Sequence, residues 1–145
     1  MIISPPFIRN RNAEESDVSW VNSMMPVDIR RNFPLNERAS WHGGMHITHS
    51  DMAPHPEMVR AIADGEVVSF RNPSGTDKRD AFPLNYNGST DDGYVLLKHK
   101  TDIGENCTVE YYSLYMHLQD RLDSAIREGA RVWRKDPIGR GGMVD

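Results

Sequence analysis

The residues with the clearest chemical potential in this chain are histidines gathered in one short stretch. Three of the six histidines lie in residues 41–49, which read WHGGMHITH, and His42 and His46 are four residues apart. Neutral imidazole is the commonest protein metal ligand near neutral pH, and each ligand of a Zn²⁺ ion must lie within about 2.1 Å of it. The spacing makes His42 and His46 a candidate ligand pair. A Gly-Gly turn with unrelated surface histidines is the alternative interpretation.

The two glycines between these histidines limit the backbone that could bring the rings together. A fully extended chain would separate the two Cα atoms by roughly 13 Å, so the pair needs either a helix, which places residues i and i+4 on one face, or a bend. Gly43 and Gly44 disfavour a helix, because each costs about 1 kcal/mol there, and they permit a bend. We therefore expect a bent strand or a strand–loop junction, with the two rings facing each other.

Length and composition narrow the classes of function. The chain has 145 residues, 38% of them hydrophobic and 26% charged, which is typical of one globular domain. The net charge of −4 provides no basic surface for a phosphate backbone, so no nucleic-acid partner is expected. The single cysteine, Cys107, excludes an internal disulfide and a Cys-based zinc site. No segment approaches the ~20 apolar residues of a membrane span, and the first residues lack the pattern of a signal peptide.

Short β-prone runs separated by turn residues predict a mostly β fold of antiparallel strands with one short helix. Residues 1–40 contain four prolines and little other pattern, so we expect an N-terminal lead-in strand or linker, with the helix near residues 16–24. Residues 41–145 form the predicted domain. Within it, Asp64-Gly65 lies between two apolar runs and predicts a hairpin over residues 59–70.

The second half of the chain holds the clearest strand candidates, residues 94–99 and 109–118. Alternation in VEYYSLYMHL assigns Tyr112, Leu114, Met116 and Leu118 to the core face, and Tyr111, Ser113, Tyr115 and His117 to a more polar face. We also expect a turn at residues 101–107, a short helix at residues 120–129 closed by Gly129, and a last strand at residues 130–138.

The order of these segments resembles the lysostaphin-type (LytM-like) zinc metallopeptidases, which cleave peptide cross-links in bacterial cell walls. The likeness is carried, in order, by HGGMH, VRAIADGEVV, YVLLKH, YSLYMHL and EGARVWRKDPIGRGG, from roughly Trp41 to the end of the chain. It implies a lysostaphin-type antiparallel sheet (duplicated hybrid motif-like), a Zn²⁺ cofactor and a peptidoglycan peptide as substrate. It also implies action in the periplasm or outside the cell.

The resemblance assigns roles to individual residues. The family's pattern is a zinc-binding His, three residues, and then a zinc-binding Asp; His42 matches the first ligand, whereas His46 stands in place of the Asp. An imidazole can replace a carboxylate as a zinc ligand, and the lost negative charge would leave the metal-bound water more acidic. His49 and Asp51 are the substitutes if His46 points away. His117 matches the family's histidine that assists the zinc-bound water in catalysis.

The family closes its site with an HxH pair, which supplies the third protein ligand and another catalytic histidine. This chain stops at Asp145, and no histidine follows His117. We therefore expect the family's C-terminal strands to be missing. The chain alone should bind zinc weakly and be inactive unless a downstream segment or a second chain completes the site. The alternative function is a catalytically inactive module that binds peptidoglycan or a partner protein.

Other polar and aromatic residues receive simpler interpretations. His99 is expected at the surface or at the rim of the site, and Tyr111 and Tyr115 as wall residues beside His117. Ser113 has no Ser-His-Asp context in the sequence, so no serine nucleophile is expected. Trp41 and Trp133 are interpreted as core or rim aromatics.

Overall fold

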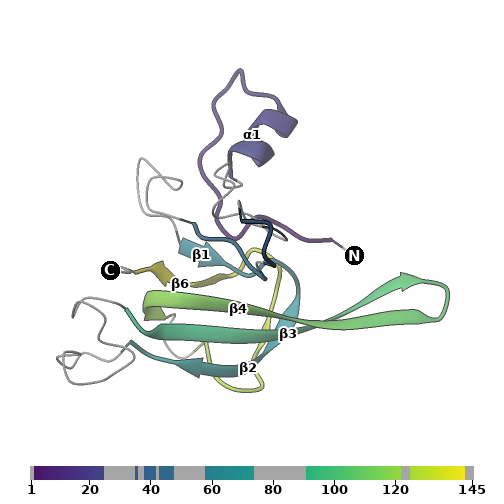
Figure 1. The fold of residues 1–145 in the computed structure, drawn as a ribbon, viewed down its shortest axis with the longest axis vertical. Helices are drawn as coiled ribbons and strands as arrows, with labels where there is room; N and C mark the ends of the chain where they lie inside the picture. Colours follow the sequence, from purple (N-terminus) through teal and green to yellow (C-terminus); the bar gives the residue numbers. More distant parts are fainter. Residues whose placement is uncertain are drawn as a thin grey trace. The chain divides into compact units, whose positions relative to one another are not determined.

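The protein is built around one antiparallel β-sheet. The structure is a computed structural model and describes residues 2–24, 35, 38–41, 43–47, 58–73, 91–121 and 125–142. Its elements are α1 (Asp17–Ser23), β1 (Met58–Arg60), β2 (Gly65–Arg71), β3 (Gly93–Gly104), β4 (Cys107–Arg121), β5 (Arg131–Val132) and β6 (Pro137–Gly141). The strand order is β1-β6-β4-β3-β2-β5 (Figure 1). The predicted mostly β class with one short helix is confirmed for these residues, whereas the lysostaphin type of the sheet stays a prediction.

The chain contains two compact units. The first combines Met1–Pro6 with Met58–Asp145 and contains the sheet, and the second is Phe7–Glu57. The predicted domain boundary after residue 40 lies inside the second unit.

The described part of the second unit contains the short helix α1. The side chain of Ser16 accepts a hydrogen bond of 3.1 Å from the backbone N–H of Ser19, which satisfies a donor of the first turn of α1. The helix expected near residues 16–24 is therefore confirmed. Phe7 and Met24 are buried in this unit, and Trp20 and Ile47 pack against them. The described residues of the predicted lead-in, 2–24, 35 and 38–40, contain no strand, and Leu35 makes an isolated antiparallel β-bridge with Trp41.

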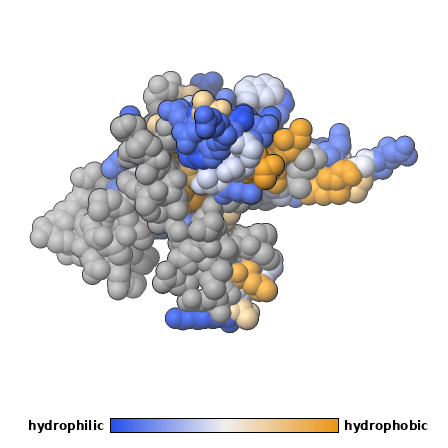
Figure 2. Space-filling view, turned by 90° about the horizontal axis from the view of Figure 1, so that it is seen from above, coloured by the Kyte–Doolittle hydropathy of each residue, from blue (hydrophilic) through white to orange (hydrophobic). Residues whose placement is uncertain are grey.

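The two longest strands, β3 and β4, form a hairpin. Its turn is Glu105-Asn106, where Asn106 has a left-handed φ of 56°, a conformation that Asn tolerates. The predicted turn at residues 101–107 is therefore shorter than expected, because both strands continue up to it. The pairing of β2 with β3 ends at Glu66↔Lys98, so residues 100–110 form a two-stranded arm (Figure 1). Figure 2 shows apolar surface on this arm behind a hydrophilic tip.

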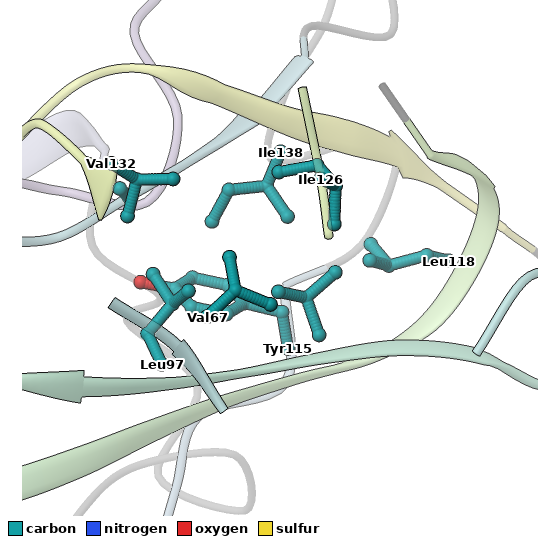
Figure 3. Packing of buried hydrophobic residues seen from close by; sticks show 9 residues of the cluster. Val67, Leu97, Tyr115, Leu118, Ile126, Val132 and Ile138 are labelled. Atoms are coloured by element: carbon teal, nitrogen blue, oxygen red, sulfur yellow. The ribbon is translucent and has the colours of Figure 1, made fainter. Parts of the chain in front are cut away.

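The core of the first unit lies inside a curled sheet. Only residues 133–136 connect β5 to β6, although four strand spacings separate these strands in the sheet order. On a flat sheet this is roughly 19 Å, more than the ~17 Å that such a connection spans when extended. The sheet therefore bends, and side chains of five strands meet. The buried cluster comprises Ala61, Val67, Val95, Leu97, Tyr115, Leu118, Ile126, Val132 and Ile138 (Figure 3).

The hairpin predicted at Asp64-Gly65 is wrong. β1 pairs with β6, and β2 pairs with β3 and β5, so the two apolar runs lie far apart in the sheet order. The residues between the two strands are held instead by a distant turn. Ala61 donates its N–H to the Asp136 carbonyl at 2.9 Å and accepts from the Lys135 N–H at 2.8 Å. Residues 61 and 64–65 therefore do not form the predicted turn, because pairing with residues more than seventy positions away in the sequence is the stronger interaction.

Two predictions near the C-terminus are also corrected. The first two residues of the expected helix, 120–121, continue β4, and residues 125–129 form bends and turns; residues 122–124 of that prediction lie outside the described residues. Gly129 has a φ of 75°, so it serves a turn rather than a helix end. The single strand expected at residues 130–138 is two strands, β5 and β6, separated by a turn.

The face assignment of β4 is wrong for most of its length. Tyr112, Leu114 and Met116 are exposed, at 55%, 54% and 58%, whereas Tyr111 and Ser113 are partly buried and Tyr115 belongs to the core. Leu118 is buried as predicted, at 2% exposure. One uninterrupted alternation cannot bury both Tyr115 and Leu118, so the strand must be irregular between them.

Candidate functional site

His117 lies in the β-bulge that interrupts β4. Val95 pairs with Tyr115 and Gly93 pairs with Leu118, so Tyr94 alone faces two residues, Met116 and His117. This two-to-one count defines a bulge. His117 has a φ of 57°, in the left-handed region where histidine is more frequent than most residues. Because of the bulge, Leu118 points into the core, and the His117 side chain does not follow the alternation of inward and outward side chains along β4.

His117 is half-buried, and backbone groups of neighbouring residues hydrogen-bond to both its side chain and its main chain. Its Nδ1 lies 3.0 Å from the Asp91 carbonyl oxygen. Because a carbonyl only accepts hydrogen bonds, Nδ1 carries the proton and donates it. The His117 carbonyl in turn accepts from the Gly142 N–H at 2.8 Å. In the neutral ring, Nε2 is therefore the nitrogen with the lone pair, as a general base or a metal ligand requires.

A second histidine, His99, lies in a buried polar network rather than at the surface. It is 1% exposed, which contradicts its prediction as a surface or rim residue. Its Nδ1 donates to the Asp64 carbonyl at 2.8 Å, and its Nε2 lies 2.7 Å from the Ser113 hydroxyl. The ring stacks on Tyr111, with centroids 4.7 Å apart and an interplanar angle of 24°. The network joins β3, β4 and the residue preceding β2.

Ser113 and Tyr115 extend this network into the core. The Ser113 hydroxyl also lies 3.2 Å from the Tyr115 hydroxyl, which accepts a hydrogen bond of 2.9 Å from the Ile62 N–H. Burial raises the pKa of the Tyr115 hydroxyl. Burial and then the nearby Asp64 carboxylate raise the pKa of Tyr111. Both phenols therefore stay neutral at physiological pH. Tyr115 is a hydrogen-bonding member of the network, and Tyr111 stacks on His99.

The contact between Ser113 and His99 is a serine–histidine pair that sequence reasoning missed. The third group is a backbone carbonyl rather than a carboxylate, and Ser113 does not line the neighbouring cavity of about 460 Å³ formed by residues that include His99, Tyr111 and Arg134. A nucleophile must be reachable by a substrate, so we assign this pair a structural role. The turn Glu105-Asn106 alone would place Tyr112 opposite His99, and a register shift between Asp102 and Gly104 is what brings Ser113 to the face of His99. The sequence contains no evident signal for that shift.

The predicted wall residues lie on another face than His117, and the two tryptophans lie outside the core. Tyr111 and Tyr115 share the inward face of β4 with Ser113, and not with His117, because the bulge separates them. Trp41 and Trp133 are 71% and 53% exposed, so neither is a core residue. The Arg131 guanidinium lies 4.3 Å from the Trp133 ring centroid.

The candidate metal ligands are only partly within the described residues. His46 belongs to the second unit, and its residue is exposed, as a ligand in an open metal site can be. His42, His49 and Asp51 lie outside the described residues, so the expected facing of His42 and His46, and the place of His117 beside the zinc ligands that the family resemblance implies, stay predictions. The described part of the chain contains no group of three His, Cys, Asp or Glu residues arranged to hold a metal ion.

Comparison with known proteins gives one partial similarity. No protein-family model matches the chain, and no solved structure matches it. The chain is 29% identical over 108 residues to aminopeptidase 2 of Geobacillus stearothermophilus. The alignment covers 72% of this chain and 25% of that protein, so the chain spans about a quarter of the length of this relative.

In the described ranges, no helix has the length and apolar character needed to cross a membrane.

Proposed function

We propose that this chain carries part of the active site of a zinc-dependent peptidase of the lysostaphin type, which hydrolyses peptide cross-links of bacterial peptidoglycan outside the cytoplasm. The observation that carries the proposal is His117, a half-buried histidine in a β-bulge, with Nδ1 donating to a backbone carbonyl. Bulges often direct a side chain into an active site. The similarity to an aminopeptidase supports the broader assignment to peptidases.

In this proposal His117 handles protons and charge at the scissile peptide bond. With Nδ1 engaged by Asp91, Nε2 accepts a proton in the neutral ring. Once protonated, the same nitrogen donates a hydrogen bond to the oxygen of the scissile carbonyl as negative charge develops on it. The hydrogen bond to Asp91 keeps the ring in one orientation through both states.

The proposed metal ligands are His42 and His46, with His49 or Asp51 as replacements for His46. Bound Zn²⁺ supplies an acidic water and polarises a carbonyl group. The donor set suits zinc because imidazole nitrogen is a common ligand for this ion. A catalytic zinc site normally has three protein ligands, so the proposed site needs one ligand besides this pair.

Substitution of His117 tests the proposed activity. We expect H117A to lower the rate of peptide release from purified peptidoglycan by roughly 10²–10⁴-fold, the usual contribution of a general acid–base group. The control is Q119A, an exposed neighbour on β4, which should retain the full rate. Mass spectrometry of released peptides is the readout, for the 145-residue chain and for the longest chain that its gene encodes.

Wild-type cleavage by H117A would exclude the proposed role of His117. Peptidoglycan binding without cleavage by either chain would favour the inactive binding module.

Substitution of His46 tests the proposed metal site. We expect H46A to lose zinc and H46D to retain it, because the family that the chain resembles uses a carboxylate at this position. The measurement is zinc stoichiometry after dialysis against a mild chelator, in the longest chain that the gene encodes. Full zinc retention by H46A would refute His46 as a ligand and transfer the assignment to His49 or Asp51.

A further inference from the structure

We infer that Asp91 and Gly142 are positioning residues for His117. Their contact holds the Asp91 carbonyl against Nδ1 and thereby determines which ring nitrogen is open to a substrate. The inference deepens the proposed function and depends on it for its catalytic meaning. The contact itself can be tested without any substrate.

The first observation is that no side chain fits at position 142. A Cβ atom there would lie 2.5 Å from Asp91 Oδ2, 2.6 Å from Asp91 Cβ and 2.7 Å from the His117 carbonyl oxygen. Real Cβ atoms essentially never approach other heavy atoms so closely. The side chain of Asp91 therefore packs directly on the bare backbone of Gly142, and both residues adjoin the bulge.

The second observation is that residues 91 and 142 bind His117 at different atoms. The Gly142 N–H donates to the His117 carbonyl at 2.8 Å, and the Asp91 carbonyl accepts from Nδ1 at 3.0 Å. Asp91 precedes β3 and Gly142 follows β6, so two chain segments meet at one bulged residue. A displacement of either segment would separate Nδ1 from its acceptor.

The chemical consequence concerns the tautomer of the ring. While the Asp91 carbonyl is in place, the neutral ring carries its proton on Nδ1 and presents the lone pair of Nε2. Without that acceptor, the proton can occupy Nε2 in a fraction of the molecules, and those molecules present no lone pair there. The Asp91–Gly142 contact therefore sets the fraction of protein with the working tautomer.

The test is the His117 tautomer in G142A, compared with G104A as the matched control. An added Cβ at Gly104 would meet no heavy atom within 4 Å. Two-bond ¹H–¹⁵N NMR spectra of the metal-free 145-residue chain, recorded at alkaline pH, report which ring nitrogen is protonated. We expect Nδ1–H in the wild type and in G104A, and a ratio of Nδ1–H to Nε2–H that is lower by roughly five- to tenfold in G142A, which corresponds to the loss of one hydrogen bond. Protonation at Nε2 in the wild type, or a wild-type tautomer in folded G142A, would overturn the inference.

Two substitutions of Asp91 keep the test decisive if G142A does not fold. D91N retains the shape that packs on Gly142 and should keep the wild-type tautomer, whereas D91A removes most of that shape and should lower the ratio. D91A with the wild-type tautomer would overturn the inference. Because these spectra need no substrate, the positioning role can stand even if the chain cleaves no peptide. If these variants keep the wild-type tautomer while the protein cleaves peptidoglycan, the positioning role is refuted and the proposed function stands.

Discussion

At the scale of single residues, the two histidines of the sheet have opposite environments. His99 has both ring nitrogens within hydrogen-bond distance of protein groups and is almost fully buried. His117 is half-buried, and the hydrogen bond that the structure shows for its ring involves Nδ1. Buried polar groups contribute to stability only while their partners are present. These environments give His99 a stabilising role and are consistent with the proposed catalytic role of His117.

Replacement of His99 by alanine should destabilise the first unit. The substitution removes the imidazole partner of the Asp64 carbonyl and one of the two partners of the Ser113 hydroxyl, and it creates a cavity beside Tyr111. We expect a loss of roughly 2–4 kcal/mol in the free energy of unfolding. Urea denaturation followed by circular dichroism measures it. The exposed neighbour Lys100 provides the control, because K100A should change stability by less than about 0.5 kcal/mol. Equal urea midpoints for the two variants would contradict the role of the network.

At the scale of elements, the sequence predicted local features better than long-range pairing. The helix near residues 16–24 and the strands at residues 94–99 and 109–118 follow from capping and β-propensity, which act over a few residues. The hairpin at Asp64-Gly65 failed because the partner of β1 is β6, and a local turn signal contains no information about a strand so distant in the sequence.

The face of β4 could not be predicted for a related reason. Both sets of alternating residues contain large apolar side chains, Tyr111 and Tyr115 in one set and Leu114 and Met116 in the other, so alternation alone does not distinguish them. The bulge at His117 then reverses the order, and the residues that hydrogen-bond to it, Asp91 and Gly142, are more than twenty positions away in the sequence. A Cβ at Gly93 would overlap the Leu118 carbonyl oxygen, a close approach that only the folded structure reveals.

The two-stranded arm should be less stable than the rest of the hairpin to which it belongs. A hairpin without a third strand or a packed face is marginally stable in water, and Ile103 in the arm is 51% exposed. Hydrogen exchange followed by NMR should therefore show rapid exchange of backbone amides in residues 101–109 and slow exchange in residues 95–98, which lie between β2 and β4. Equal protection of the two segments would contradict this expectation.

At the scale of the whole molecule, the described residues of each unit contain their own buried cluster. One is enclosed by the curled sheet, and the other surrounds Phe7 and Met24 in the second unit. Each unit also has its own carboxylate held by a cation. In the first unit a 2.8 Å ion pair with Lys98 lowers the pKa of Glu110. In the second unit the hydrogen bond from Arg9 lowers the pKa of Glu15. Acid should therefore weaken each unit through its own carboxylate.

The second unit allows this expectation to be tested at one residue. Because the pKa of Glu15 in the folded chain is below its ordinary value of 4.5, its contribution to stability is present above that value and is lost as the pH falls through the lower, folded value. E15Q should therefore lower the stability of the unit at neutral pH and reduce its loss of stability in acid. Trp20 is a suitable probe, since its indole N–H donates to the Arg9 carbonyl at 3.0 Å.

The measurement is urea unfolding of the second unit from pH 7 to pH 3, followed by Trp20 fluorescence in a background in which Trp41 and Trp133 are replaced by phenylalanine. The matched control is E14Q, because Glu14 is the exposed neighbour of Glu15, and its removal should leave both the neutral stability and the acid dependence unchanged. If E15Q and E14Q give the same dependence on pH, the pair of Arg9 and Glu15 does not stabilise the second unit. If E15Q also changes the acid unfolding of the first unit, monitored by circular dichroism of the sheet, then the two cores do not respond to acid independently.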